Sequence, residues 1–135
     1  MQGGNGMRRL VLTLGLGMLA IATAAAAESR FERSLKMLAP SERLVQLCDY
    51  TAMQHIRRDH RQYRPDRAVA DARSRVYINK NTVEAKGGAF RSKRKWYALS
   101  YTCNASPDNM KVISFHFKVG AEIPQSKWAL YSLWE

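Results

Sequence analysis

Apolar residues recur at three- and four-residue spacing in the first part of the chain after residue 28, and this period predicts helices. The segment Ser29 to Leu38 is predicted to form a short helix. Pro40 favours the start of a second one, because proline is tolerated in a first helical turn. The apolar stripe of that second segment, which runs to about His60, consists of Leu44, Leu47, Cys48, Ala52 and Ile56. Asp49 could instead cap a further helix and divide the segment in two.

Beyond a polar loop at Arg61 to Asp66 the apolar period changes to two, which is typical of strands with one wet face. Short strands are predicted near Val69 and at Arg75 to Ile78, with a turn at Asn79-Lys80-Asn81 leading into Thr82-Val83. Two longer strands are predicted at Trp96 to Cys103 and at Lys111 to Val119. The residues expected to point inward are Tyr97, Leu99, Tyr101 and Cys103 from one strand, and Ile113, Phe115, Phe117 and Val119 from the other.

Pro124 is expected to open a short C-terminal helix whose Trp128, Leu130, Tyr131 and Trp134 could pack on the sheet. These elements predict a single α+β domain over residues 28–135. Its N-terminal helices would pack on one face of a roughly four-stranded antiparallel sheet.

The N-terminus has the composition of a secretory signal peptide. Arg8 and Arg9 precede an apolar run from Leu10 to Ala22, and small residues follow at Ala24 to Ala27. We therefore predict a signal peptide at residues 1–27 and a mature domain in the periplasm or outside the cell. Three alternatives stay open: a permanent membrane anchor, cleavage after Ala24, and translation from Met7.

The mature chain holds two cysteines, Cys48 and Cys103, which are 55 positions apart. Because exported proteins occupy compartments in which disulfides persist, we expect these two to be bonded to each other. Two buried free thiols are the alternative. No Cys-x-x-Cys spacing occurs, and the histidines do not match a zinc-protease motif, so no metal site is expected.

Positive charge is concentrated in the middle of the chain. The whole sequence has 22 Lys or Arg against 11 Asp or Glu, and residues 55–95 alone hold 13 against four. Two clusters contribute most of this excess, Arg57, Arg58, Arg61, Arg64 and Arg67, and Arg91, Lys93, Arg94 and Lys95. Such a field attracts an anionic surface or polymer, and arginine suits bidentate contact with phosphate or carboxylate. A solvated basic face that only keeps the protein soluble is the alternative.

No catalytic motif stands out, so no residue is assigned as catalytic and no cofactor is expected. His116 together with His55 or His60 could form the acid–base pair of a small basic hydrolase if the fold brought them together. Trp96 is out of phase with the inward face of its strand and adjoins Lys95. It is therefore a candidate for an exposed ring that stacks on a sugar or base, although packing against a helix is equally possible.

Several segments of the chain resemble one family of exported alphaproteobacterial proteins, known as domain of unknown function 930. The segments that carry the resemblance are Arg43-Leu44 through Cys48-Asp49, Ala52-Met53, Asp59-His60, Arg64 to Arg67, Ala89 to Arg91, the pattern from Trp96 to Cys103, Ser106 to Asp108 and Lys111-Val112. They span roughly residues 38 to 131, and Ala39 departs from the aspartate expected before Pro40. The resemblance implies an envelope protein of a Gram-negative cell and implies no reaction.

These observations favour a non-enzymatic binding module for an anionic cell-envelope polymer or membrane surface, with no specific nucleic acid expected as partner. The two basic clusters would bind this partner. A histidine-dependent hydrolase and a protein-interaction or inhibitory module are the alternatives.

Overall fold

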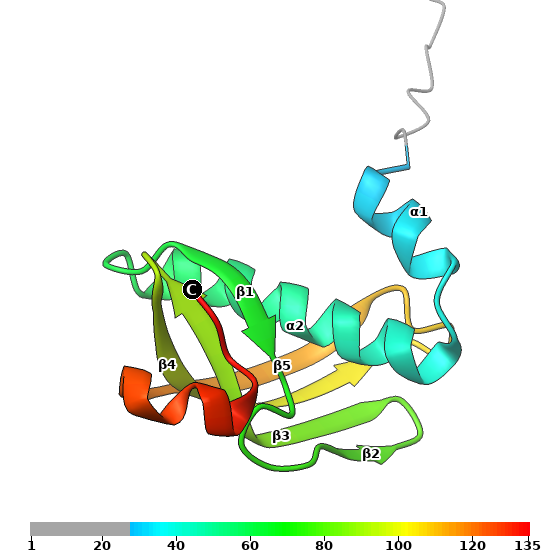
Figure 1. Cartoon of the computed structure of the whole chain (residues 1–135). Coiled ribbons are helices and arrows are strands. Elements are labelled where there is room, and N and C mark those ends of the chain that lie inside the picture. The colour runs from blue at the N-terminus through cyan, green and yellow to red at the C-terminus, as the bar shows by residue number, and fades with distance from the viewer. Residues whose placement is uncertain (1–27) are drawn as a thin grey trace, which may run out of the picture.

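The computed structural model describes residues 28–135, so the predicted signal peptide lies outside the described residues. Figure 1 shows one long helix lying across a twisted sheet and a shorter N-terminal helix projecting beyond its end. The elements are α1 (Arg30–Lys36), α2 (Pro40–Asp59), β1 (Pro65–Val69), β2 (Tyr77–Asn79), β3 (Thr82–Ser92), β4 (Lys95–Ala105), β5 (Val112–Glu122) and the 3-10 turns η1 (Gln125–Lys127) and η2 (Ala129–Tyr131). The predicted α+β class is confirmed. Within residues 28–135 no helix is long and apolar enough to cross a membrane.

The two helices begin for different local reasons. Ser29 and Glu32 form a reciprocal capping box at the start of α1. At the start of α2, Pro40 occupies the first turn, while Ala39 makes no side-chain capping bond. Helix α2 runs unbroken to Asp59, so the alternative in which Asp49 caps a separate helix is wrong. Asp49 instead lies buried on the face of α2 that meets the sheet.

Arg43 fixes the turn between the helices. Its guanidinium donates hydrogen bonds to the carbonyl oxygens of Leu35 and Leu38 at 3.0 and 3.1 Å, and to that of Asp108 at 3.1 Å. These bonds add side-chain donors to carbonyls at and just beyond the end of α1, where the helical hydrogen-bond ladder stops. One side chain therefore ties α1, α2 and the loop before β5 together.

The sheet is antiparallel with the order β1-β3-β4-β5, and β2 pairs with the first residues of β3. In β4, Leu99, Tyr101 and Cys103 are buried against α2, as their alternation predicts. In β5 the prediction fails at Ile113, which is 66% exposed. The pairing of β4 with β5 shifts register at Asn104 and Ala105, so the alternation that holds from Phe115 onward does not extend back to Ile113.

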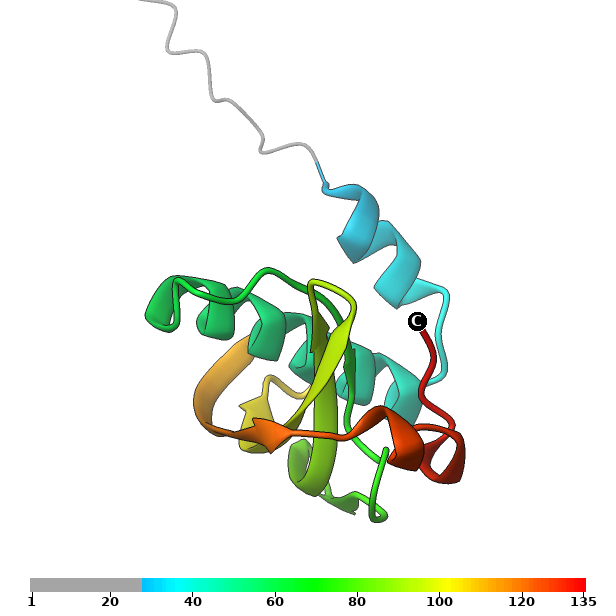
Figure 2. The ribbon, with the colours of Figure 1, turned by 60° about the vertical axis from the view of Figure 1, so that its left-hand side comes forward.

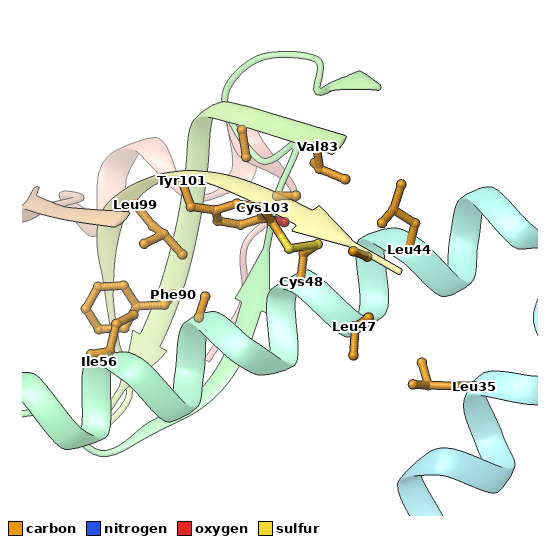
Figure 3. Close-up of a cluster of buried hydrophobic side chains, with 14 residues drawn as sticks. Leu35, Leu44, Leu47, Cys48, Ile56, Val83, Phe90, Leu99, Tyr101 and Cys103 are labelled. Carbon is orange, nitrogen blue, oxygen red and sulfur yellow. A yellow bond between two sulfur atoms is a disulfide. The ribbon is translucent and has the colours of Figure 1, made fainter. Parts of the chain in front are cut away.

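The predicted disulfide is present between α2 and β4. Figure 3 shows Cys48 and Cys103 joined at the centre of the cluster of buried side chains. Both cysteines are fully buried, and their Cα atoms lie 6.0 Å apart, as is usual for bonded cysteines. The bond joins the helical layer covalently to the sheet.

A second, smaller core lies on the opposite face of the sheet. Ala89 and Trp96 form its floor, and the C-terminal segment covers them with Ile123, Trp128 and Leu133. The short C-terminal helix is realised as two 3-10 turns, and the backbone turns at Ser132, whose φ is 54°. Because this segment completes a core, we expect it to be needed for folding.

The bulge in β3 produces a first testable prediction. At Gly87 the pairing with β4 shifts register, and a Cβ built there would lie 2.7 Å from the backbone nitrogen of Ser74 and closer still to its Oγ. Gly87→Ala should therefore lower the free energy of unfolding by about 1–3 kcal/mol, because the backbone of residue 74 must move. Urea denaturation measures this change. Ser114→Ala, on the exposed side of β5, is the control, and equal stability of the two variants would contradict the prediction.

Candidate functional site

The two basic clusters of the sequence meet at one end of the domain. The guanidinium of Arg57 donates to the carbonyl oxygen of Pro65 at 2.8 Å, and the amide of Arg64 donates to Ser92 Oγ at 2.7 Å. Arg67 of β1 lies opposite Arg91 of β3 in the sheet. We call this region the basic end and define it as Arg57, Arg58, Arg61, Arg64, Arg67, Arg91, Lys93, Arg94 and Lys95. It comprises the end of α2, the α2–β1 loop, β1 and the β3–β4 turn.

Carboxylates neutralise part of this charge. The ion pairs are Arg58–Asp59, Arg91–Asp66, Arg94–Glu135 and Lys95–Glu122, at 2.6 to 3.5 Å. Nine cations therefore face four carboxylates, and the excess stays positive. Except for Arg91, the cations of these pairs are largely exposed, so the pairs are weak and screened by salt.

Five of the nine basic side chains have no carboxylate partner within residues 28–135, and two of these five also make no other polar or aromatic contact. Among the described residues, the side chains of Arg61 and Lys93 make no ion pair and donate no hydrogen bond. The turn that carries Lys93 also has unusual backbone angles, because Lys93 and Arg94 have φ values of 50° and 66°. Glycine and asparagine adopt this left-handed conformation most easily, so two long basic residues are an uncommon choice for such a hairpin.

The prediction that Trp96 is an exposed stacking residue is wrong. Trp96 is 0% exposed, and its indole Nε1 donates to the carbonyl oxygen of Trp134 at 2.7 Å. It lies outside the inward phase of β4 because it belongs to the second core, on the other face of the sheet. Trp134 is the exposed aromatic here: it is 47% exposed, and the guanidinium carbon of Arg67 lies 5.4 Å from its ring centroid.

The structure does not bring the three histidines together. His55 and His60 extend from the end of α2 and contact the ring of Phe117, at centroid distances of 6.0 and 5.9 Å. His116 is the neighbour of Phe117 in β5, so its side chain points to the opposite face of the sheet. The acid–base pair that the hydrolase alternative requires is therefore not formed by these side chains. Burial, and next the charge of Arg58, lower the pKa of His55.

A cleft of about 530 Å³ lies beside α2, next to the basic end. Helix α1 contributes Phe31, and the C-terminus contributes Trp134. The side chains from α2 include Glu42, Val45, Asp49, Tyr50 and Met53, and those from β1 and the loop that follows include Asp66, Arg67, Asp71 and Val76. Figure 2 shows the C-terminal tail turning back toward the helices. Trp134 of this tail lines the cleft. Its walls come from segments that are distant in the chain, so local sequence patterns do not predict the cleft.

Asp49 is the buried acid of the cleft. It is 6% exposed, and its Oδ1 accepts a hydrogen bond of 2.8 Å from the hydroxyl of Tyr101. Burial raises the pKa of this carboxyl to about 7, and the negative charge of Asp71 adds to the effect. Hydrogen bonds from Tyr101 and from the backbone of Ala70 act in the opposite direction. The same burial, together with the charge of Asp49, raises the pKa of Tyr101.

Carboxyl groups with such a perturbed pKa are more frequent at binding and catalytic sites than elsewhere. The acids of the cleft do not form a metal centre, because no group of three or more His, Cys, Asp or Glu with that arrangement occurs in residues 28–135. The cleft and the basic end are therefore the two candidate sites of the domain.

These features define the class of the protein as a small α+β domain with one disulfide, a basic end and an adjoining acidic and aromatic cleft. Within that class the chain belongs to the family Domain of Unknown Function DUF930, whose model matches residues 35–133. The resemblance noted in the sequence is confirmed as to family. Comparison with curated proteins and with solved structures gives no match.

Proposed function

We propose that the domain is a non-enzymatic binding module that holds an anionic polymer of the cell envelope at its basic end, after export to the periplasm. One observation supports this proposal above the others. Two clusters that are separated in sequence by residues 68–90 lie at one end of the fold, where Arg67 of β1 is opposite Arg91 of β3. A charge excess that only served solubility would not need to converge.

The chemistry of the basic end suits a polyanion. Arg61 and Lys93 are free to bind, and the exposed ion pairs of Arg58, Arg94 and Lys95 can exchange their carboxylates for ligand phosphates or carboxylates. The left-handed β3–β4 turn supports the same interpretation. Backbone conformations that are unfavourable for the residues present are enriched at functional sites.

A charge-reversal experiment tests the proposal. Arg61→Glu/Lys93→Glu should weaken binding to isolated lipopolysaccharide or peptidoglycan by at least about tenfold, because basic residues near an anionic surface contribute roughly 1 kcal/mol each. Co-sedimentation at a series of salt concentrations measures the affinity. The wild-type affinity should fall steeply with salt, and that of the variant should fall less steeply.

Lys80→Glu/Lys111→Glu is the matched control. It makes the same change in net charge, in the β2–β3 turn and beside β5, and neither lysine forms an ion pair within residues 28–135. The proposal requires this control to retain most of the binding. Equal losses in the two variants, or binding of the wild type to neither polymer, would contradict it.

The β3–β4 turn allows stability and binding to be separated. Lys93→Asn/Arg94→Gly places the preferred residues of such a turn where both φ values are positive. We expect this variant to be at least as stable as the wild type in urea and to bind the polymer more weakly. A more stable variant with unchanged affinity would mean that the turn has no part in binding.

A further inference from the structure

We propose that the cleft beside α2 is a second binding site, which takes a small organic cation: a protonated amine or guanidinium attached to an apolar or aromatic body. The cleft adjoins the basic end and shares Arg67 with it, but its ligand would have the opposite charge from that of the proposed function, so either proposal can fail alone. It rests on the volume of the cleft, its charge and its aromatic walls.

The volume and the walls suit a small molecule. A cleft of about 530 Å³ lies within the range of small-molecule sites, which are mostly apolar with a few convergent polar groups. Val45, Met53 and Val76 supply aliphatic surface here. The rings of Phe31 and Tyr50 stack with centroids 4.0 Å apart and form one wall. Tyr50 is 36% exposed, so part of this ring surface is available to a ligand.

The charge of the cleft is opposite to that of the domain. Four acidic side chains line it, those of Glu42, Asp49, Asp66 and Asp71, and Arg67 is the one cation among its lining residues in the described part of the chain. Asp66 is already paired with Arg91. Glu42 and Asp71 form no ion pair within residues 28–135, and both are exposed. An incoming cation therefore meets two unneutralised carboxylates.

The cleft already holds one cation on an aromatic ring. The guanidinium of Arg67 lies over Trp134, so the aromatic part of the cleft already makes a cation–π contact, and Trp134 is still 47% exposed. Asp49 lies deeper, where its carboxyl is held by Tyr101. The apolar body of a ligand would contact the rings while its charged head faced Glu42 and Asp71. A neutral or anionic molecule of the same shape would lack the attraction between the charged head and the carboxylates of Glu42 and Asp71.

Three probes of matched shape test the proposal on the domain. They are 4-phenylbutylamine, 4-phenylbutanol and 4-phenylbutyrate, which carry a positive, a neutral and a negative head. In an NMR titration the amine should shift the signals of the Trp134 indole N–H and of the amides of Tyr50 and Asp71. It should bind at least about fivefold more tightly than the alcohol, and the carboxylate should bind most weakly.

Equal affinities for the three probes would reduce the cleft to a nonspecific apolar surface and overturn the proposal. Tightest binding of the carboxylate would also overturn it, as would the absence of amine binding up to about 10 mM. Shifts confined to Arg61 and Lys93 would place the probe at the basic end and would equally contradict the cleft as its site.

A matched pair of variants tests whether the carboxylates of the cleft contribute to binding of the amine. Glu42→Gln removes a carboxylate of the cleft, and Glu84→Gln removes one on the far face of the sheet. We expect about fivefold weaker amine binding for Glu42→Gln and less than a twofold change for Glu84→Gln. Asp71→Asn should behave like Glu42→Gln. Arg61→Glu/Lys93→Glu, which tests the basic end, should not weaken amine binding, so the two proposals can be distinguished.

Discussion

Reduction of the Cys48–Cys103 disulfide should lower the free energy of unfolding by about 4 kcal/mol. The bond closes a loop of 55 residues, and the chain-entropy model assigns roughly this value to a loop of that length. Small domains have only about 5–15 kcal/mol of stability, so the reduced protein should be largely unfolded under mild denaturing conditions. Urea denaturation with and without reductant, followed by tryptophan fluorescence, measures the change.

Cys48→Ala/Cys103→Ala supplies the control. This variant should unfold at a urea concentration near that of the reduced wild type and should not respond to reductant. The bond itself is checked by treating the unfolded, unreduced protein with iodoacetamide, which should add no mass. Addition of two groups would show two free thiols and would contradict the link between α2 and β4.

Local patterns predicted much of this fold because both the helix period and the strand alternation depend on near neighbours. The stripe that contains Cys48 and the inward face that contains Cys103 follow from periods of 3.6 and two. Two cysteines on facing stripes could then be expected to bond. Prediction failed at Ile113 because a register shift is set by the partner strand, which no pattern within β5 records.

The sites were less predictable because they depend on contacts between distant segments. Trp96 is buried by a C-terminal segment that returns to it from more than 25 residues away, and its own neighbours Lys95 and Arg94 suggested exposure. The merger of the basic clusters depends on the pairing of β1 with β3. The cleft joins α1, α2, β1 and the C-terminus, and only its buried Asp49, an acid on an apolar helix face, could have been noticed in the sequence.

The buried Asp49 should make the stability of the domain fall as the pH rises. Its pKa is raised from 3.8 to about 7 in the folded protein, so between these values the folded state holds a proton that the unfolded state has released. The stabilisation is therefore complete below about pH 4, is lost as the pH rises through 7, and changes no further above that. A shift of this size corresponds to about 4 kcal/mol.

The difference between the wild type and Asp49→Asn isolates this effect, because other titrating groups are common to both. His55, whose pKa is lowered, destabilises both proteins in acid and cancels in the difference. Measured by urea denaturation from pH 4 to pH 8, the wild type should lose up to about 4 kcal/mol relative to the variant. A carboxyl titration of Asp49 by carbon NMR with a midpoint below pH 5 would contradict the prediction.

Tyr101→Phe provides a second test, in which the carboxyl of Asp49 is kept and its hydrogen-bond donor is removed. The hydroxyl of Tyr101 donates to the carboxylate and so favours its charged form, which partly offsets the effect of burial. Without it the pKa of Asp49 should rise further, and the loss of stability should extend to higher pH. A lower pKa of Asp49 in this variant would contradict the prediction. It would mean that water enters the cleft and solvates the carboxylate, because only solvation or a new cation could then stabilise its charged form.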